Sequence, residues 1–168
     1  MSKHPFGQEK QQNWLAFVQG LDAEINPDAL RLMDKLGTVS HTLHQLGAVS
    51  LADTDLSYAR FRLLMRLWFC EEFEGRSELN PSEISEMQGV SRSTISSLIR
   101  DLEAKGLIER HLDKKDRRRF NISLTEDGRS RVHAYASQHF QIIIDRFSVL
   151  TPEEQTQLSD LLTKLIPH

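Results

Sequence analysis

The chain has 168 residues, of which 39% are apolar and 27% are charged, a composition typical of a folded globular protein. Its formal net charge is −3, and its single cysteine, Cys70, excludes an internal disulfide framework. No apolar run approaches the roughly 20 residues of a membrane-spanning helix, and the N-terminus lacks the apolar core of a secretory signal. We therefore expect a cytoplasmic protein with one domain and helical extensions.

The first third of the chain predicts two helices. Apolar residues recur at roughly helical spacing before residue 22, which indicates a short helix. Asn26 followed by Pro27 is a helix start signal, and a long amphipathic helix is predicted from there to about Val49. Its apolar stripe has alternating spacings of four and three and consists of Leu32, Leu36, Val39, Leu43 and Leu46. The stripe is compatible with contact to the domain core and with contact to a second subunit.

A polar connector over residues 51–56 precedes the next predicted helix. Its candidate helix caps are Asp53, Thr54 and Asp55. The helix is predicted to run from about Leu56 to Glu74 and to end at Gly75. Its large apolar residues fall on more than one side, so we expect it to be substantially buried. They are Phe61, Leu63, Leu64, Leu67, Trp68 and Phe69.

Two short helices joined by a tight turn are predicted next. Asn80 is the candidate cap of the first helix, with a proline at its first helical position and Glu83 placed to reach back to the cap. Ile84 and Met87 are expected to form the inward face of this helix. Gly89 permits the sharp turn that follows.

The second of these helices is predicted to run from a cap at Ser91 to about Lys105. Its buried face follows the i, i+3, i+4, i+7 pattern and consists of Ile95, Leu98, Ile99 and Leu102. The opposite face carries small hydroxyl side chains and arginines, which suit a helix lying deep in a DNA major groove. The candidate DNA-binding residues of this helix are Ser91, Arg92, Ser93, Thr94, Ser96, Ser97 and Arg100.

A basic β-hairpin is predicted after Gly106. One strand covers Leu107 to Leu112, and in the other the apolar residues Phe120, Ile122 and Leu124 alternate with polar ones. The tip between the strands carries five positive charges and suits a phosphate backbone or a minor groove. The candidate DNA-binding residues of the hairpin are Lys114, Lys115, Asp116, Arg117, Arg118 and Arg119.

The charge distribution favours DNA binding despite the acidic total. From Ser91 to Phe120 there are nine Lys or Arg and five Asp or Glu, so this stretch carries +4 and the remainder of the chain −7. A basic patch attracts phosphate locally, whereas an ordinary solvated face is the alternative interpretation of such a charge run.

Two further helices are predicted at the C-terminal end. Thr125 is the candidate cap of a helix that reaches about Phe147, and Thr151 begins the last helix with a capping-box pattern. The apolar face of the last helix consists of Leu158, Leu161, Leu162 and Leu165. The predicted fold class is therefore mainly α with a small β-hairpin wing, built on a winged helix-turn-helix.

Five short motifs between Leu79 and Arg129 are informative together. In chain order they are Leu79-Asn-Pro-Ser-Glu-Ile-Ser, Val90-Ser-Arg-Ser-Thr-Ile-Ser, Leu102-Glu-Ala-Lys-Gly-Leu-Ile-Glu-Arg, Asp116-Arg-Arg and Leu124-Thr-Glu-Asp-Gly. The combination resembles the MarR-type winged-helix transcriptional regulators. This resemblance implies a homodimer whose N-terminal (1–55) and C-terminal (126–168) helices form the dimerisation region around a DNA-binding lobe at 56–125.

The resemblance also implies how the protein binds double-stranded DNA and how it is controlled. The helix at 91–105 would enter the major groove, and the wing, with Asp116 orienting Arg118, would reach the minor groove. A dimer implies a pseudo-palindromic operator, and most relatives repress. Many relatives respond to small aromatic or lipophilic effectors, for which the candidate ligand-binding residues are His41, His44, Tyr58, Phe61, Arg62, Met65 and Trp68. Ordinary packing is the competing interpretation of these residues.

Other functions receive less support from the sequence. Cys70 is a candidate redox sensor, although there is no second cysteine to resolve a sulfenate. His41 and His44, three residues apart, are a faint metal signal, and we expect neither a metal nor another cofactor. The chain lacks the glycine-rich phosphate loop, H-E-x-x-H and G-x-S-x-G motifs, so an enzyme is not expected. A winged helix used only for protein contact remains an alternative.

Overall fold

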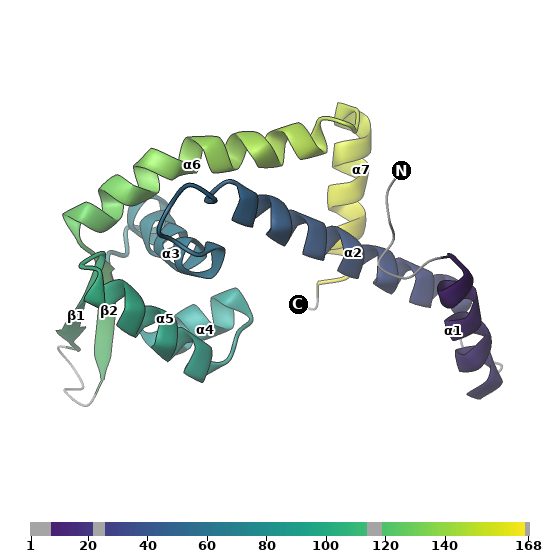
Figure 1. Ribbon diagram of the computed structural model, residues 1–168, viewed down its shortest axis with the longest axis horizontal. Coiled ribbons are helices and arrows are strands. Elements are labelled where there is room, and N and C mark those ends of the chain that lie inside the picture. The colour runs from purple at the N-terminus through teal and green to yellow at the C-terminus, as the bar shows by residue number, and fades with distance from the viewer. Residues whose placement is uncertain (1–7, 22–25, 114–118, 167–168) are drawn as a thin grey trace. The chain divides into compact units, whose positions relative to one another are not determined.

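The computed structural model describes residues 8–21, 26–113 and 119–166. Their fold is mainly helical, with seven helices and one two-stranded antiparallel sheet (Figure 1). In chain order the elements are α1 (Gln8–Leu21), α2 (Pro27–Val49), α3 (Tyr58–Glu74), α4 (Pro81–Gln88), α5 (Arg92–Ala104), β1 (Ile108–Leu112), β2 (Phe120–Leu124), α6 (Glu126–Phe147) and α7 (Pro152–Thr163). The chain divides into two compact units, residues 1–46 and 47–168. The predicted fold class is confirmed.

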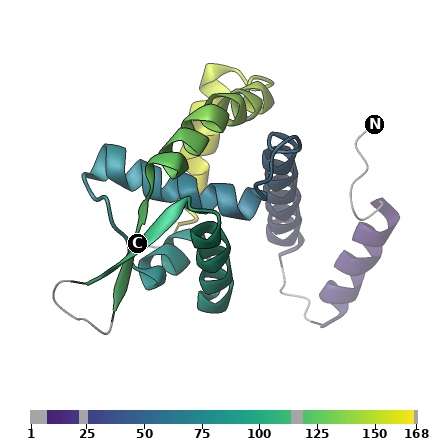
Figure 2. The same cartoon turned by 60° about the vertical axis from the view of Figure 1, so that its left-hand side comes forward.

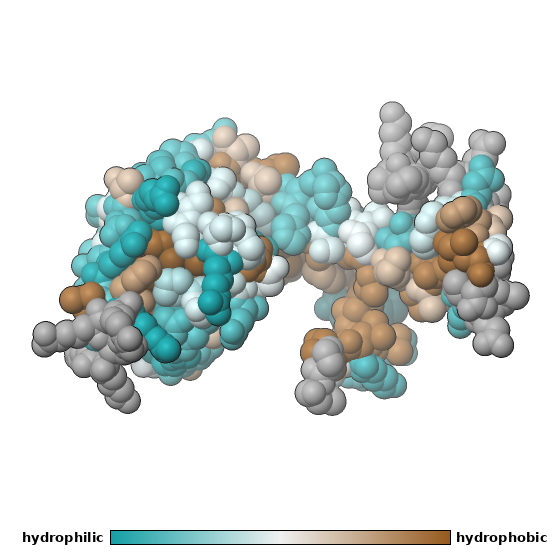
Figure 3. Space-filling view, turned by 90° about the horizontal axis from the view of Figure 1, so that it is seen from below, coloured by the Kyte–Doolittle hydropathy of each residue, from teal (hydrophilic) through white to brown (hydrophobic). Residues whose placement is uncertain are grey.

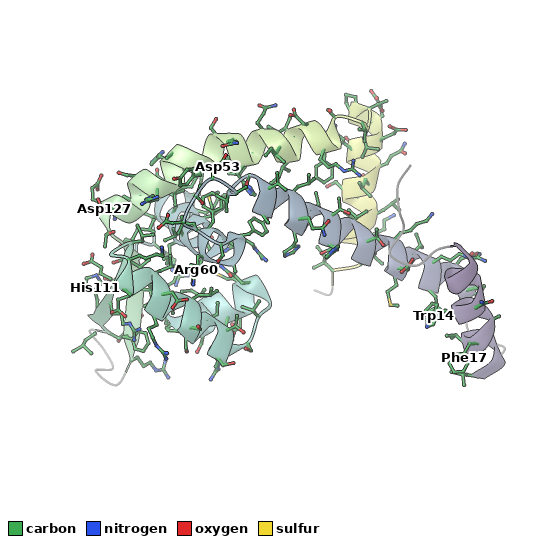
Figure 4. All side chains as sticks on the ribbon, viewed as in Figure 1. Trp14, Phe17, Asp53, Arg60, His111 and Asp127 are labelled. Atoms are coloured by element: carbon green, nitrogen blue, oxygen red, sulfur yellow. The ribbon has the colours of Figure 1, made fainter. Side chains whose placement is uncertain are left out.

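The N-terminal unit contains α1 and most of α2. The Asp28 backbone N–H donates to the Asn26 side chain at 2.9 Å, as expected of a helix start. The apolar stripe of α2 is largely solvent-exposed, with Leu32 61% and Val39 51% exposed. On α1, Trp14 and Phe17 are exposed as well (Figure 4). No helix in the described ranges is long and apolar enough to cross a membrane.

The unit of residues 47–168 has one hydrophobic core, formed around α3. Figure 2 shows α3 above α4 and α5, with the two strands beside them. The buried residues of this core come from α3, α4, α5, both strands and the first half of α6, and include Leu64, Leu67, Ile84, Ile99, Leu102, Ile122 and Val132. The predicted burial of α3 is confirmed for most of its apolar residues, but Phe69 is 45% exposed. Its ring contacts that of Phe73, also exposed, with 4.6 Å between the ring centroids.

The start of α3 differs from the sequence prediction. The helix is capped by Ser57, whose Oγ accepts the backbone N–H of Arg60 at 3.4 Å, and not by one of the three predicted residues. Thr54 instead closes the connector, because its hydroxyl donates to the backbone oxygen of Leu51 at 2.8 Å. The helix ends at Gly75 as predicted, with a φ of 64° that favours glycine.

The pair α4 and α5 has the predicted local structure with one exception. Asn80 and Glu83 form a complete capping box at the start of α4, and Gly89 adopts a φ of 64° in the turn. Ile84 is fully buried, but Met87 is 37% exposed, so the prediction that Met87 faces inward was wrong. With only eight residues, α4 buries a single side chain, and Val90 in the turn packs against the core in its place.

The two strands pair in antiparallel register, with Ile108 opposite Leu124 and Leu112 opposite Phe120. A bridge from Leu79 to Ile122 extends the pairing, with backbone hydrogen bonds of 3.0 and 2.8 Å. The hairpin is thereby joined to the segment that precedes α4. Ser123 is buried although alternation predicts it to be exposed, because His111 and Glu109 of the partner strand contact its hydroxyl.

The start of α6 approaches the start of β1 closely. Thr125 caps α6 and its hydroxyl also donates to the backbone oxygen of Gly106 at 2.6 Å. Gly128 lies so near this strand that an added Cβ would stand 2.0 Å from the backbone oxygen of Leu107. Only a glycine permits this approach.

We predict that Gly128→Ala destabilises the protein by about 1–3 kcal/mol, because the backbone of Leu107 has to move. Gly37→Ala is the matched control: Gly37 lies within α2, and beyond its own turn of helix no described residue comes within 4 Å of an added Cβ. There alanine is expected to stabilise the helix by about 0.5–1 kcal/mol. Urea unfolding at one protein concentration measures both changes. Equal midpoints for the two variants would contradict the prediction.

Candidate nucleic-acid interface

The helix α5 is positioned by its buried face. Ile95 and Leu102 are fully buried and Ile99 is 1% exposed, so this face lies in the core of the unit. Its first turn is fixed by Ser91, whose Oγ accepts the backbone N–H of Thr94 at 3.2 Å. A helix held along one side and capped at its start presents its opposite side in a defined orientation.

The predicted DNA-binding residues of α5 are all exposed. They are Ser91, Arg92, Ser93, Thr94, Ser96, Ser97 and Arg100. The hydroxyls of Ser93 and Thr94 each lie 2.8 Å from Ser91 Oγ, so the first turn is a cluster of hydroxyl groups. There is no acidic residue in this turn, where the helix dipole already favours an anion. The surface of the first half of α5 is therefore polar and positive.

A groove connects this part of α5 with the wing. It has a volume of about 690 Å³ and is lined by residues from the start of α4, the start of α5 and the start of β2: Asn80, Pro81, Ser82, Glu83, Glu86, Arg92, Ser96, Arg119 and Phe120. The structure thus brings two predicted residues of the helix, Arg92 and Ser96, together with the predicted wing residue Arg119. The remaining predicted wing residues, 114–118, lie outside the described residues.

One of the two carboxylates of the groove is internally compensated. Glu83 accepts a hydrogen bond from Arg76 at 2.6 Å and another from the backbone N–H of Asn80 at 2.9 Å. Burial acts to raise the pKa of Glu83, but the backbone hydrogen bond and the ion pair with Arg76 outweigh it and lower the pKa. Glu83 is therefore charged but neutralised by its neighbour, which reduces its repulsion of phosphate.

The base of the wing is attached to the far end of α5. Arg110 of β1 forms an ion pair with Glu103 at 2.7 Å and lies over the ring of Phe120, 4.9 Å from its centroid. The backbone N–H of Asp113 donates to the backbone oxygen of Arg119 at 3.0 Å. Sequence reasoning missed Arg110 and Glu103, because a charged residue on a strand carries no signal of its partner on a helix.

A cavity of about 370 Å³ brings together four of the predicted ligand-binding residues. It is lined by Tyr58, Phe61, Arg62, Met65, Arg66, Phe69, Gln88, His139 and Phe140. The sequence missed the last five of these, which come from α3, α4 and α6. Trp68 lies outside this lining and its ring contacts that of His133 at 5.2 Å. His41 and His44 belong to the other unit, where each is exposed and bonded within α2.

The cavity lining contains both a hydrogen-bond acceptor and a hydrogen-bond donor. His139 is only 6% exposed, and burial lowers its pKa, so the imidazole is neutral. Its Nδ1 lies 3.3 Å from Ser50 Oγ, whose hydroxyl donates to the backbone oxygen of Gly47 at 2.7 Å. Because that hydroxyl has one proton, Nδ1 is the donor to Ser50 and Nε2 is left as an acceptor. Gln88 Nε2 is a buried donor with no hydrogen-bond partner among the described residues.

The structure does not favour a thiol sensor. Cys70 is fully buried. Burial is the main cause that raises the pKa of the thiol, and a hydrogen bond with Glu74 raises it further. Since the thiolate is the reactive form, this environment suppresses oxidation. Within the described ranges no group of three His, Cys, Asp or Glu side chains is placed to hold a metal ion.

A recognition helix, a tight turn, a preceding helix and a two-stranded wing define a winged helix-turn-helix DNA-binding protein. The MarR family model matches residues 54–119. The chain is 26% identical over 143 residues to the transcriptional repressor YetL of Bacillus subtilis, covering 85% of this chain and 83% of YetL. It is 30% identical over 115 residues to the transcriptional regulator SarZ of Staphylococcus aureus, covering 68% of this chain and 70% of SarZ.

The chain belongs to the MarR family of DNA-binding transcriptional regulators, which are not enzymes. Among solved structures it is similar to MepR of S. aureus in complex with DNA, with a TM-score of 0.69 and 28% identity, over 79% of this chain and 92% of MepR. The resemblance inferred from the five sequence motifs is therefore confirmed.

Proposed function

We propose that this protein is a cytoplasmic homodimeric repressor that binds a pseudo-palindromic operator and is released by a small aromatic or lipophilic ligand. The exposed hydroxyl and arginine surface of α5, continuous with Arg119 through the groove, is the observation that carries the proposal. The proposed DNA-binding residues are those predicted on α5 and on the wing. The similar protein YetL is a transcriptional repressor, which supports repression as the function proposed for this chain.

Operator binding depends on the arginines of α5. Arg100→Ala is expected to weaken binding to the promoter DNA of the protein's own gene by about 1–3 kcal/mol if Arg100 contacts a base. The parent is expected to lose affinity steeply as salt rises, because phosphate contacts release counterions. Arg146→Ala, which removes the same charge near the end of α6, is the control. Because Arg146 lies in a proposed dimerisation segment, light scattering first verifies that this variant has the mass of the parent, and it is then expected to bind like the parent. Fluorescence anisotropy at several salt concentrations measures both variants, and an Arg100→Ala variant with parental affinity would contradict the assignment.

The C-terminal segment supplies an apolar surface for dimerisation. No described residue of α7 is buried, and Ile144, Val149, Leu161, Leu165 and Ile166 are each more than half exposed. Figure 3 shows a brown apolar surface over α7 beside the grey C-terminus. Monomeric soluble proteins rarely expose a contiguous apolar surface of this kind, so we propose that a second copy covers it. The proposed dimerisation segments are 1–55 and 126–168.

A charge introduced at Leu161 is expected to prevent dimerisation through α7. Leu161 is 59% exposed in the single chain, so Leu161→Asp is expected to leave a monomer folded and to dissociate a dimer. Thr156→Asp places the same charge on the opposite side of α7 and is the control. Light scattering after gel filtration gives the mass of each variant. A parent that elutes as a monomer, or a Leu161→Asp variant that stays dimeric, would contradict the proposal.

The cavity between α3, α4 and α6 is the proposed ligand site. Its walls are aromatic rings, and Arg62, Arg66, Gln88 and His139 add polar groups. An aromatic molecule with an acidic and a hydroxyl group fits this lining, because it supplies an anion for the arginines and a donor for His139 Nε2. A ligand bound there would shift the balance between conformations that bind DNA and those that do not.

The ligand proposal is tested with 4-hydroxybenzoate as a probe. We expect the probe to raise the melting temperature and to weaken operator binding by the parent, because it binds a cavity of the folded protein. Met65→Trp fills the cavity and is expected to abolish both effects. Met87→Trp, an exposed position outside the lining, is the control. If 4-hydroxybenzoate changed the melting temperature and operator affinity of Met65→Trp and Met87→Trp equally, this cavity would not be its binding site.

A further inference from the structure

Asp55 connects three elements through one carboxylate. It lies in the connector between α2 and α3, and its Oδ2 accepts a hydrogen bond from Lys105 Nζ at 2.7 Å. Its Oδ1 accepts one from Arg131 Nη1 at 3.1 Å. Lys105 Nζ also donates to the backbone oxygen of Asp55 at 3.3 Å, so the contact fixes the connector itself as well as the side chain.

The two partners of Asp55 are at functionally separate places. Lys105 is the C-cap residue of α5, the helix proposed to enter DNA. Arg131 lies near the start of α6 and also donates to the hydroxyl of Tyr135 at 3.3 Å, which holds its guanidinium along the helix. Asp55 therefore joins the end of the recognition helix to a helix whose far end leads to the proposed dimerisation surface.

A second ion pair holds the same end of α5. Arg60 Nη2 lies 2.5 Å from Asp101 Oδ2, and Arg60 is located where α3 faces α5 (Figure 4). The charged residues Asp101, Glu103 and Lys105 thus bind three different neighbours: α3, β1 and the connector. The exposed candidate DNA-binding residues of α5, by contrast, all precede Asp101. The helix is held at one end and presented to solvent at the other.

The ion pairs of Asp55 are too exposed to add much folding stability. The side chains of Asp55, Lys105 and Arg131 are 49%, 34% and 41% exposed, and exposed pairs typically contribute about 0–1 kcal/mol. The hydrogen bond from Lys105 lowers the pKa of Asp55, so its carboxylate stays charged at neutral pH. The contacts instead fix the orientation of α5 relative to α6, because one cation from each of these segments binds the same carboxylate.

We propose that Asp55 is a positioning residue for DNA binding: it fixes the C-terminal end of α5 relative to α6 and so sets the orientation in which the first half of α5 meets the operator. The proposal rests on the proposed role of α5 in DNA binding. Asp55 is acidic and is expected to touch no DNA, so its contribution acts entirely through Lys105 and Arg131.

The positioning role and a purely electrostatic role of Asp55 predict opposite changes in operator affinity when Asp55 is removed. Loss of a negative charge from a DNA-binding protein should strengthen its attraction for phosphate. If Asp55 positions α5, Asp55→Ala is instead expected to weaken operator binding by roughly 2- to 30-fold, the range of about 0.5–2 kcal/mol found for coupling residues. The salt dependence should stay parental, because no phosphate contact is lost.

Asp53→Ala is the matched control. Asp53 lies in the same connector (Figure 4), is exposed, and has the same charge, but it forms no ion pair with any residue that the structure describes. This variant is expected to bind operator as tightly as the parent or slightly more tightly. Urea unfolding accompanies each binding measurement, and the midpoint of Asp55→Ala is expected to stay near that of Asp53→Ala.

A second variant keeps the proposal falsifiable if Asp55→Ala unfolds. Arg131→Ala should weaken binding more than the control Arg146→Ala, which removes the same charge. The double variant Asp55→Ala/Arg131→Ala should bind operator no more weakly than the weaker-binding single variant, because Asp55→Ala already removes the contact between Arg131 and the connector. If the parent binds operator and Asp55→Ala binds like Asp53→Ala, this inference alone is overturned. If the parent does not bind duplex DNA, the proposed function is overturned together with it.

Discussion

The burial of one side of α5 is the interaction on which the rest of this structure depends. Ile95, Ile99 and Leu102 are almost completely removed from water, and each buried side chain of this size stabilises a fold by about 1.5–3 kcal/mol. Rotation of α5 would expose these residues and bury hydroxyls and arginines without partners. The hydrophobic core therefore determines which side chains are available to DNA. Capping, the turn at Gly89 and the surrounding ion pairs refine an orientation that the apolar face has already selected.

The distribution of charge along α5 also favours DNA binding by its exposed side. Its residues up to Arg100 include two arginines and several hydroxyls, whereas its acidic residues, Asp101 and Glu103, come later and are compensated by Arg60 and Arg110. Glu83 in the adjacent groove is likewise neutralised by Arg76. A protein with a net charge of −3 can therefore offer phosphate a locally favourable surface. The acidic residues near the interface serve as internal counterions that hold basic side chains in place.

Local signals predicted the helices and the exposed face of α5 well, because periodicity and caps are encoded within a few residues. The capping box of Asn80 and Glu83 at the start of α4 and the buried apolar face of α5 are examples. The failures have a common cause, which is tertiary contact. Asp55 was one of three candidate caps of α3, yet its carboxylate binds Lys105, 50 residues away, and Ser57 caps the helix instead. Likewise, nothing near His139 in the sequence indicates the buried bond to Ser50, 89 residues away.

The same caps have a consequence for how the chain folds. Five helices, α3 to α7, each begin at a Ser, Thr or Asn whose side chain accepts a backbone N–H two or three residues ahead: Ser57, Asn80, Ser91, Thr125 and Thr151. Each of these boundaries forms without help from distant segments, and the hairpin closes over a short separation. Chains dominated by such local contacts fold rapidly. The slowest assembly step is then expected to be the docking of α6 on α3 and the segment before it, because this step forms the bond between Ser50 and His139, which are 89 residues apart.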